Sequence, residues 1–235
     1  MRIWIYSFCW NEKDMLPFYL RHYSTFAEKI ILFDDKSDDG TLEIASKCPL
    51  VEVRECPYSG LNDNENLCLS QEAYKEARGK ADWVMWMDID EIIYAPDIVE
   101  TLKQCSEYDV ASTDGYNMTG MGVPIDDGRQ IYEIRRSGVR APVYAKPVIF
   151  KPEADMKWTR GRHAVEGCDA KITPDPLFKL LHYRYMGWKY TEERNLRNYD
   201  RAGRSACAWS CSPEWKGEHS PVWADYAMLK AFNVI

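Results

Sequence analysis

The stretch Trp83-Val-Met-Trp-Met-Asp-Ile-Asp-Glu-Ile-Ile-Tyr94 contains an apolar run that stops at a cluster of carboxylates. Residues 84–87 are few and apolar on both faces, which predicts a buried central strand. Asp88 and Asp90 follow where that strand should end. Because residues two apart point the same way in an extended chain, both carboxylates can face one ligand while Ile89 turns back into the fold.

Two carboxylates this close repel each other unless a cation lies between them or one of them takes a proton. Divalent Mg²⁺ or Mn²⁺ suits oxygen ligands and usually completes its coordination with phosphate oxygens and water. Open α/β sheets place their ligands at the carboxyl ends of strands. The stretch therefore indicates a site for a metal and a diphosphate. The alternative is that Asp88, Asp90 and Glu91 form a solvated loop or cap a following helix.

The composition favours one globular α/β domain. The chain has 235 residues, of which 46% are hydrophobic, and this is enough for a full core. A formal net charge of -7 argues against nucleic acid as a general partner. The nine Trp and fifteen Tyr outnumber the seven Phe, and such amphipathic aromatic residues occur both in cores and in sites that stack on sugars or bases.

The cysteines and the apolar runs bear on location. The eight Cys show neither the spacing of a small disulfide scaffold nor that of a zinc site, and Cys207 and Cys211 lack a matching second pair. The apolar run at the N-terminus is too short for a signal peptide, and no run is long enough for a transmembrane segment. These features predict a cytoplasmic protein with reduced cysteines.

Strands and helices alternate up to the carboxylate stretch. The expected strands are residues 3–8, 29–33, 51–54 and 84–87, and the expected helices are residues 15–26, 41–46 and 65–78. This order is typical of a mostly parallel sheet covered by helices. Three of the strands run into the polar loops Asn11-Glu12, Asp34-Asp35 and Asp88-Ile-Asp90, which should open on the same edge of the sheet.

These loops also carry a resemblance. Asn11-Glu12, then Asp34-Asp35-Lys-Ser-Asp-Asp-Gly-Thr41, then Asp88-Ile-Asp90-Glu91 resemble, in order and spacing, family-2-type glycosyltransferases of the GT-A fold. The match is closest to the branch whose metal motif continues Asp-x-Asp-Glu, and it covers about the first hundred residues. It implies a three-layer sandwich with a mostly parallel central sheet. One GT-A-like catalytic domain is expected over residues 1–235, with a nucleotide-binding half (1–95), an acceptor-side half (96–200) and a C-terminal tail or lid (201–235).

The resemblance also implies the reaction. A hexosyl or deoxyhexosyl group would pass from a nucleotide-sugar to a hydroxyl of a glycan or glycoconjugate acceptor, with inversion, in glycan biosynthesis. Asp90 would be the main ligand of Mn²⁺ or Mg²⁺, and Asp88 would lie near the ribose and the metal. Asp35 would bind the base of a UDP- or GDP-linked donor, although residues 65–77 offer Asn66, Gln71 and Lys75 where uridine enzymes often carry Arg. The expected donor-binding residues are Cys9, Asn11, Glu12, Asp35, Asp88 and Ile89.

The second half supplies candidates for the remaining roles. Asp114, after the expected strand 109–113, is the candidate base that takes the acceptor proton, or else a turn Asp before Gly115. His182, after the expected strand 177–181, is the candidate third metal ligand, or else a structural residue. Lys146, Arg162 and His163 are possible contacts to phosphate or acceptor, with solvated surface as the simpler account of Lys146.

The remaining segments are assigned more simply. The sequence predicts a helix over 97–107, a loop over 124–128, a strand over 143–150 bent at Pro147, and a helix over 191–201. The charged residues of this last helix are expected on a solvated face. Trp209, Trp215 and Trp223, which follow this helix, would shape an acceptor pocket, pack as a lid or anchor the tail to the core.

Two other functions stay open. A sugar nucleotidyltransferase would need a Gly-rich loop after the first strand to hold a triphosphate, whereas this chain has Cys9-Trp-Asn-Glu12. A non-catalytic module that binds nucleotide-sugar or glycan would not need the carboxylates Asp88 and Asp90, which are both present.

Overall fold

The computed structural model describes residues 1–201, 228 and 230–235, and its central sheet is mostly parallel. This sheet has the order β3-β2-β1-β4-β9-β6, and the first four strands run parallel, whereas β9 is antiparallel to both of its neighbours. Its strands are β1 (Ile3–Cys9), β2 (Lys29–Asp34), β3 (Val51–Glu55), β4 (Trp83–Trp86), β6 (Val110–Ala111) and β9 (Ile149–Phe150). The predicted α/β fold is confirmed.

A second sheet, which the sequence did not predict, has the order β11-β8-β7-β10-β5. Its strands are β5 (Glu91–Tyr94), β7 (Thr113–Thr119), β8 (Ser137–Arg140), β10 (Phe178–Tyr185) and β11 (Phe232–Asn233). Strand β10 runs parallel to β7, and the other pairs are antiparallel. Strand β5 begins one residue after Asp90, so the acidic motif turns directly from the first sheet into the second.

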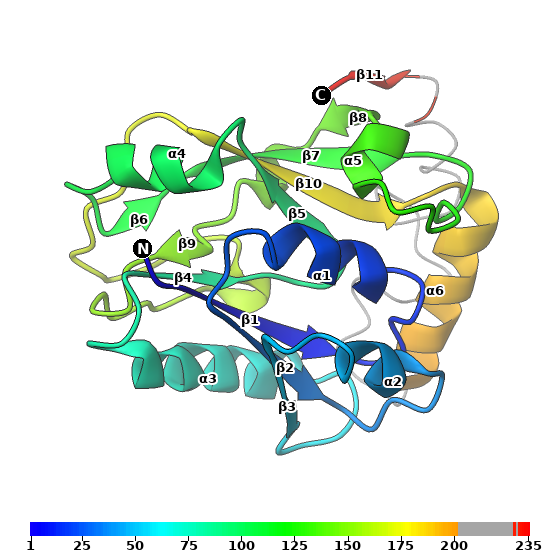
Figure 1. Ribbon diagram of the computed structural model, residues 1–235, viewed down its shortest axis with the longest axis horizontal. Coiled ribbons are helices and arrows are strands. Elements are labelled where there is room, and N and C mark those ends of the chain that lie inside the picture. Colours follow the sequence, from blue (N-terminus) through cyan, green and yellow to red (C-terminus); the bar gives the residue numbers. More distant parts are fainter. Residues whose placement is uncertain (202–227, 229) are drawn as a thin grey trace.

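Alternating apolar residues bury both faces of β1. Ile3 and Ile5 face a core that includes helix α1 (Leu16–Tyr23), and Trp4 and Tyr6 face the opposite core. Helix α1 lies between the two sheets (Figure 1), and the Tyr23 hydroxyl donates to the Glu91 carbonyl at 3.1 Å. The acidic turn is therefore held against a rigid core.

The opposite face of the central sheet is covered by helix α3 (Asp63–Ala73) and the 3₁₀ turn η1 (Tyr74–Ala77). The Asn62 side chain caps α3 by accepting from the backbone amides of Asn64 and Glu65, so the helix begins two residues earlier than expected. Tyr74 anchors the end of this segment, because its hydroxyl donates to the Ala154 carbonyl at 2.7 Å.

The other helices are α2 (Thr41–Ala45), α4 (Ile98–Gln104), α5 (Ile131–Ile134), α6 (Trp188–Arg201) and the 3₁₀ turns η2 (Pro142–Tyr144) and η3 (Arg160–Arg162). Among them, α2, α4 and α6 differ from the predictions only at their ends, whereas the short helix α5 and the 3₁₀ turns η2 and η3 were not predicted. The strand expected over 143–150 is wrong for its first part, where η2 forms instead. Strand β10 runs past the expected end at residue 181, so His182 lies inside a strand.

Within the described part of the chain, no helix combines the length and apolar character of a membrane span. The cysteines at positions 9, 48, 56, 68, 105 and 168 are free thiols. Most of the expected tail or lid over 201–235 lies outside the described residues, including Cys207, Cys211 and the three tryptophans Trp209, Trp215 and Trp223. At its end, β11 pairs with β8.

The fold makes one prediction about pH. His22 on α1 is buried edge-on against Tyr23, Phe26 and Tyr132, and burial lowers its pKa to about 4. Between pH 6.5 and 4 the unfolded chain binds a proton that the folded chain does not, so the free energy of unfolding falls as the pH falls, by up to about 3 kcal/mol. His22→Phe should remove this contribution, which corresponds to the uptake of about one proton on unfolding. The free energy of unfolding of both proteins is measured with urea at pH 7 and pH 4.5. Equal slopes against pH for both proteins would contradict it.

Candidate functional site

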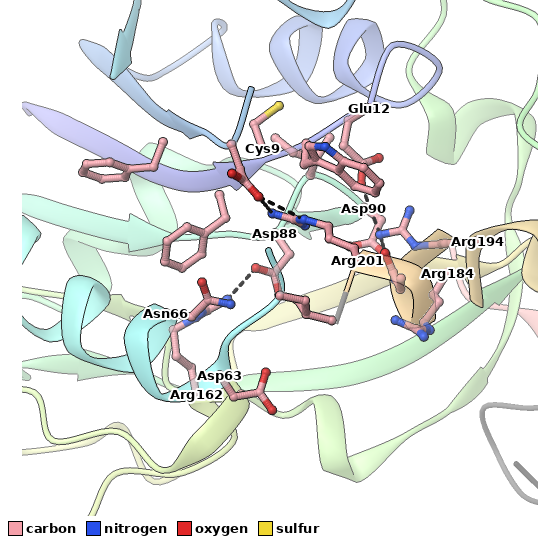
Figure 2. Close-up of a pocket in the computed structure, with 18 of the residues that line it drawn as sticks. Cys9, Glu12, Asp63, Asn66, Asp88, Asp90, Arg162, Arg184, Arg194 and Arg201 are labelled. Atoms are coloured by element: carbon pink, nitrogen blue, oxygen red, sulfur yellow. Dashed lines mark hydrogen bonds and ion pairs between the residues drawn. The ribbon is translucent and has the colours of Figure 1, made fainter. Parts of the chain in front are cut away.

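A cavity of about 300 Å³ lies where β1, β2 and β4 end, and the three acidic loops line it together (Figure 2). The convergence predicted for these loops is confirmed. The predicted residues that line the cavity are Cys9, Glu12, Asp35, Asp88, Ile89, Asp90, Lys146, Arg162, His163 and His182. Two predicted residues, Asn11 and Asp114, are not part of its lining.

Asn11 ties the first loop to the second. Its side-chain oxygen accepts from the Asp38 backbone amide at 2.9 Å, and its amide nitrogen donates to the Asp38 carboxylate at 2.8 Å. Its φ of 51° lies in the left-handed region, which Asn tolerates better than most residues. Asn11 thus fixes the shape of the loop that presents Glu12. The Glu12 backbone amide in turn donates to the Thr41 hydroxyl at 2.8 Å.

Asp35, and not Asp34, faces the cavity. The Asp34 carboxylate accepts from Ser37 within its own loop. Oδ2 of Asp35 accepts from the Gly60 amide at 2.8 Å and from Nη2 of Arg201 at 2.7 Å. The Arg201 guanidinium also lies 4.6 Å from the centre of the Trp10 ring. The end of α6 is therefore held on the second acidic loop.

One wall of the cavity is apolar and carries a single amide. Phe33, Leu61 and Leu67 supply apolar surface, and Asn66 lies among them. The Tyr58 hydroxyl donates to Oδ1 of Asn66 at 2.5 Å, which fixes the orientation of the amide and turns its nitrogen away from Tyr58. This wall offers a flat ring an apolar surface with a hydrogen-bond donor at its edge.

Asp88 is neutralised by two cations. Its Oδ1 accepts from Nη2 of Arg162 at 2.5 Å, and its Oδ2 accepts from Nζ of Lys146 at 3.4 Å. Burial alone would raise the pKa of Asp88, but Arg162 and Lys146 outweigh it and hold that pKa below its ordinary value. The carboxylate is therefore ionised at neutral pH.

Lys146 also forms a fully buried ion pair with Glu91. Its Nζ lies 2.5 Å from Oε1 of Glu91, and the two side chains are 4% and 0% exposed. Burial would lower the pKa of Lys146, but Glu91 and Asp88 outweigh it and raise that pKa. The expectation that Lys146 is solvated surface is wrong, because the carboxylates of the motif draw it into the interior.

Asp90 shares an arginine with Glu12. Nη2 of Arg194 lies 2.9 Å from Oδ2 of Asp90 and 3.3 Å from Oε1 of Glu12, so the guanidinium bridges the two loops. Burial would raise the pKa of Asp90, but Arg194 and then His182 lower it well below its usual range. Figure 2 shows Arg194, Asp90 and Glu12 together at one end of the cavity.

His182 lies beside the same carboxylate. Its Nε2 is 3.5 Å from Oδ2 of Asp90, and its Nδ1 is 2.9 Å from Oδ1 of Asn117. An amide oxygen only accepts, so Nδ1 donates to it, and this hydrogen bond fixes the orientation of the ring with Nε2 towards Asp90. This is the support that metal-binding histidines usually have.

The fit to a divalent cation is thus partial. In the part of the chain that the structure describes, no group of three or more His, Cys, Asp and Glu side chains is arranged to hold a metal ion. Asp90 and His182 supply two suitable donors, whereas both oxygens of Asp88 are bound to Arg162 and Lys146. Phosphate oxygens and water would complete the coordination.

His163 is held at the cavity by a hydrogen bond to a backbone carbonyl. Its Nδ1 lies 2.7 Å from the Val143 carbonyl oxygen. Because a carbonyl oxygen only accepts, Nδ1 carries the proton of the neutral ring, and Nε2 carries none. Burial and, to a smaller extent, the positive charge of Lys146 lower the pKa of His163 to about 4. A Cβ on Gly161 would lie 2.8 Å from Nε2 of this ring, and the φ of 70° at this position also favours glycine. The ring is therefore neutral at pH 7.

Asp114 lies elsewhere. It is the second residue of β7 and not at the end of a strand, and its carboxylate accepts from Arg140 at 3.0 Å and from the Tyr116 hydroxyl at 2.8 Å. The strand that was expected to end at residue 113 instead continues through residues 115–118. The structure therefore does not bring Asp114 together with the other predicted site residues.

Sequence reasoning missed most of the cations in the cavity. Arg184, Arg194, Arg197 and Arg201 line it, as do Asp63 and Asn66. The solvated face predicted for α6 is wrong at Arg194, which is 9% exposed. The available signal was spacing: Arg194, Arg197 and Arg201 recur at intervals of three and four residues, which places them along one side of the helix.

Comparison with known proteins gave matches among solved structures only. No family model matches the chain, and no curated protein does. Residues 1–349 of TarS from S. aureus are 13% identical, with 86% of this chain and 66% of that chain covered and a TM-score of 0.44. The complex of the same TarS fragment with UDP-GlcNAc is 14% identical, with 95% and 78% covered and a TM-score of 0.45. The mannosyltransferase PcManGT from Pyrobaculum calidifontis, in complex with GDP-Man and Mn²⁺, is 13% identical, with 87% and 65% covered and a TM-score of 0.48. The chain thus spans just under two thirds of the length of the first TarS fragment and of PcManGT.

The buried pair of Lys146 and Glu91 should be costly to break from one side. Lys146→Met leaves Glu91 buried without its cation, and we expect a loss of about 3–5 kcal/mol in the free energy of unfolding, measured with urea. The double variant Lys146→Met/Glu91→Met should regain most of the loss. Lys103→Met, at an exposed pair with Glu100, is the matched control with little effect. A double variant no more stable than the single one would contradict the pairing.

Proposed function

We propose that the chain is a glycosyltransferase that moves a hexosyl or deoxyhexosyl group from a nucleotide-sugar to a hydroxyl of a glycan or glycoconjugate. The observation that carries this proposal is the joint lining of one cavity by Glu12, Asp35, Asp88 and Asp90 with Lys146 and the arginines. The ordered motifs after β1, β2 and β4, which resemble family-2-type glycosyltransferases, support the same function. We keep the single catalytic domain and the cytoplasmic location as parts of the proposal.

The donor would span the cavity with its base at one end and its diphosphate at the other. Asp35 accepts hydrogen bonds, and the Asn66 amide nitrogen donates them, next to the apolar surface of Phe33 and Leu67. Uracil and guanine each present a ring N–H beside a carbonyl oxygen, which suits this pair, so we propose a UDP- or GDP-linked donor. Arg162 and Lys146 would offset the diphosphate charge.

A divalent cation, Mn²⁺ or Mg²⁺, would be held by Asp90 and His182, with Asp88 close by. When bound, such an ion offsets the negative charge that develops on the departing nucleotide. Asn117 would keep His182 oriented for this role through its hydrogen bond to Nδ1. The buried, ionised carboxylate of Asp90 supplies the negative charge that attracts the ion.

An inverting transfer needs a group that takes the proton of the acceptor hydroxyl. Asp114, the residue expected in this role, lies outside the cavity lining and is bound to Arg140 and Tyr116. His163 lines the cavity and has one nitrogen fixed on the Val143 carbonyl. We therefore assign the proton acceptor to the second nitrogen of His163, which is unprotonated at neutral pH.

Nucleotide binding is the first test of this function. In thermal-shift measurements with UDP, GDP, CDP and dTDP, each with and without Mn²⁺, we expect UDP or GDP to raise the melting temperature most, and more so with the metal. Binding only to the native state stabilises it by about 2.7 kcal/mol at a ligand concentration of 100 Kd. Asp35→Asn should weaken the shift, and Asp114→Asn, as the control outside the cavity, should leave it unchanged. A protein that binds none of the four nucleotides under either condition would contradict the assignment.

Two variants distinguish His163 from Asp114 as the proton acceptor. With saturating donor and acceptor, His163→Asn should lower kcat by about 10²–10⁴-fold, the usual contribution of a positioned base, while donor affinity changes little. Asp114→Asn should keep kcat near that of the unchanged chain. The opposite pattern would return Asp114 to the role and leave His163 as a binding contact.

A further inference from the structure

Arg194 is bound to the same carboxylate, Asp90, that the proposed metal ion would use. The same oxygen, Oδ2 of Asp90, lies 2.9 Å from Nη2 of Arg194 and 3.5 Å from Nε2 of His182. The guanidinium and a divalent cation would therefore compete for one carboxylate oxygen. We propose that Arg194 is a resident counter-ion of Asp90, which a divalent cation displaces only when a nucleoside diphosphate takes the guanidinium. This inference rests on the proposed function and adds the coupling between its two ligands.

The burial of Arg194 explains why a metal alone would bind poorly. The side chain is 11% exposed, and its Nε has no hydrogen-bond partner among the described residues. If a metal took Asp90, the guanidinium would lose its closest ion pair and stay largely out of water. Leaving a buried charge without its partner is among the most unfavourable changes in a protein interior.

Two groups would hold Arg194 in place during the exchange. Oε1 of Glu12 lies 3.3 Å from Nη2, and the Tyr190 hydroxyl accepts from Nη1 at 3.1 Å. These contacts keep the guanidinium at the cavity when it leaves Asp90. Its planar fork then matches two phosphate oxygens, as arginine commonly does. The diphosphate would thus replace Asp90 as the anionic partner, and the metal would replace Arg194 as the cationic partner of Asp90.

The consequence is cooperative binding. Each ligand alone must break the Arg194–Asp90 pair without restoring the lost charge partner, whereas the two together restore both partners. Binding of either ligand must therefore strengthen binding of the other by the same factor. Arg162 on Asp88 and Arg201 on Asp35 are not in competition with the metal donors Asp90 and His182, so the coupling is assigned to Arg194 alone.

The test measures Mn²⁺ binding to the full chain without any nucleotide, by the loss of the free Mn²⁺ signal in electron paramagnetic resonance. Arg194→Met should bind Mn²⁺ about tenfold or more tightly than the unchanged chain, and Arg194→Lys, which keeps the charge, should stay near the unchanged value. Arg197→Met is the matched control, because this arginine lines the same cavity on the same helix, and its hydrogen bond within the described part of the chain goes to the Asn11 carbonyl, at 3.4 Å. It removes one positive charge from the cavity without touching Asp90.

A second measurement gives the coupling itself. The Mn²⁺ affinity is determined with and without UDP or GDP. The ratio of the affinity with nucleotide to the affinity without it should be at least several-fold smaller in Arg194→Met than in the unchanged chain or in Arg197→Met. Arg194→Gln, which is neutral and polar, serves in the same way where the Met variant fails to fold.

The outcomes separate this inference from the proposed function. Mn²⁺ affinity in Arg194→Met that equals that of Arg197→Met would overturn the inference, and nucleotide binding by the unchanged chain would leave the proposed function standing. An unchanged chain that binds Mn²⁺ tightly without nucleotide would overturn it as well. Failure of every variant to bind Mn²⁺, with or without nucleotide, would overturn both the inference and the metal site.

Discussion

The structure depends on the burial of three carboxylates within one turn. Asp90 and Glu91 are almost fully buried, and Asp88 is half-buried beside them, where β4 of one sheet passes into β5 of the other. Charges removed from water in this way persist only with partners close by. Each partner comes from a different later segment: Lys146 before β9, Arg162 from η3 and Arg194 from α6. The burial of these carboxylates therefore requires the second half of the chain to supply the counter-charge.

The same need prepares the cavity for an anionic ligand. Cations that hold buried carboxylates are already desolvated and oriented, so a diphosphate meets fixed donors and not flexible surface side chains. A buried pair contributes little net stability compared with apolar packing, because desolvation offsets most of the attraction. These pairs are better understood as positioned charge: α6 carries Arg194 and Arg201 on one face and so joins Glu12, Asp90 and Asp35 into one wall.

The central sheet could be predicted from local pattern because its strands are short apolar runs that end at polar loops. Residues 3–8 and 29–33 carry that signal, and the parallel order then places their loops at one edge. The second sheet gave a weaker signal. Strand β7 contains Asp114, Gly115 and Asn117, which favour turns, and its pairing with β10 and β8 overrides that preference. The start of β5 was hidden because Glu91 looks solvated until Lys146 is placed beside it.

The carboxylates of the site were predictable, and most of its cations were not, for one physical reason. A carboxylate at a strand end is positioned by its own strand, so a few residues of sequence suffice. A cation that neutralises it is positioned by the tertiary fold: Lys146 follows Glu91 by 55 residues, and Arg201 follows Asp35 by 166. A charged residue read alone favours solvent, which is how Lys146 and Arg194 were misread. Acidic residues that are predicted to be buried therefore predict cationic partners elsewhere in the chain. A helix with its arginines on one face is the strongest candidate to supply them.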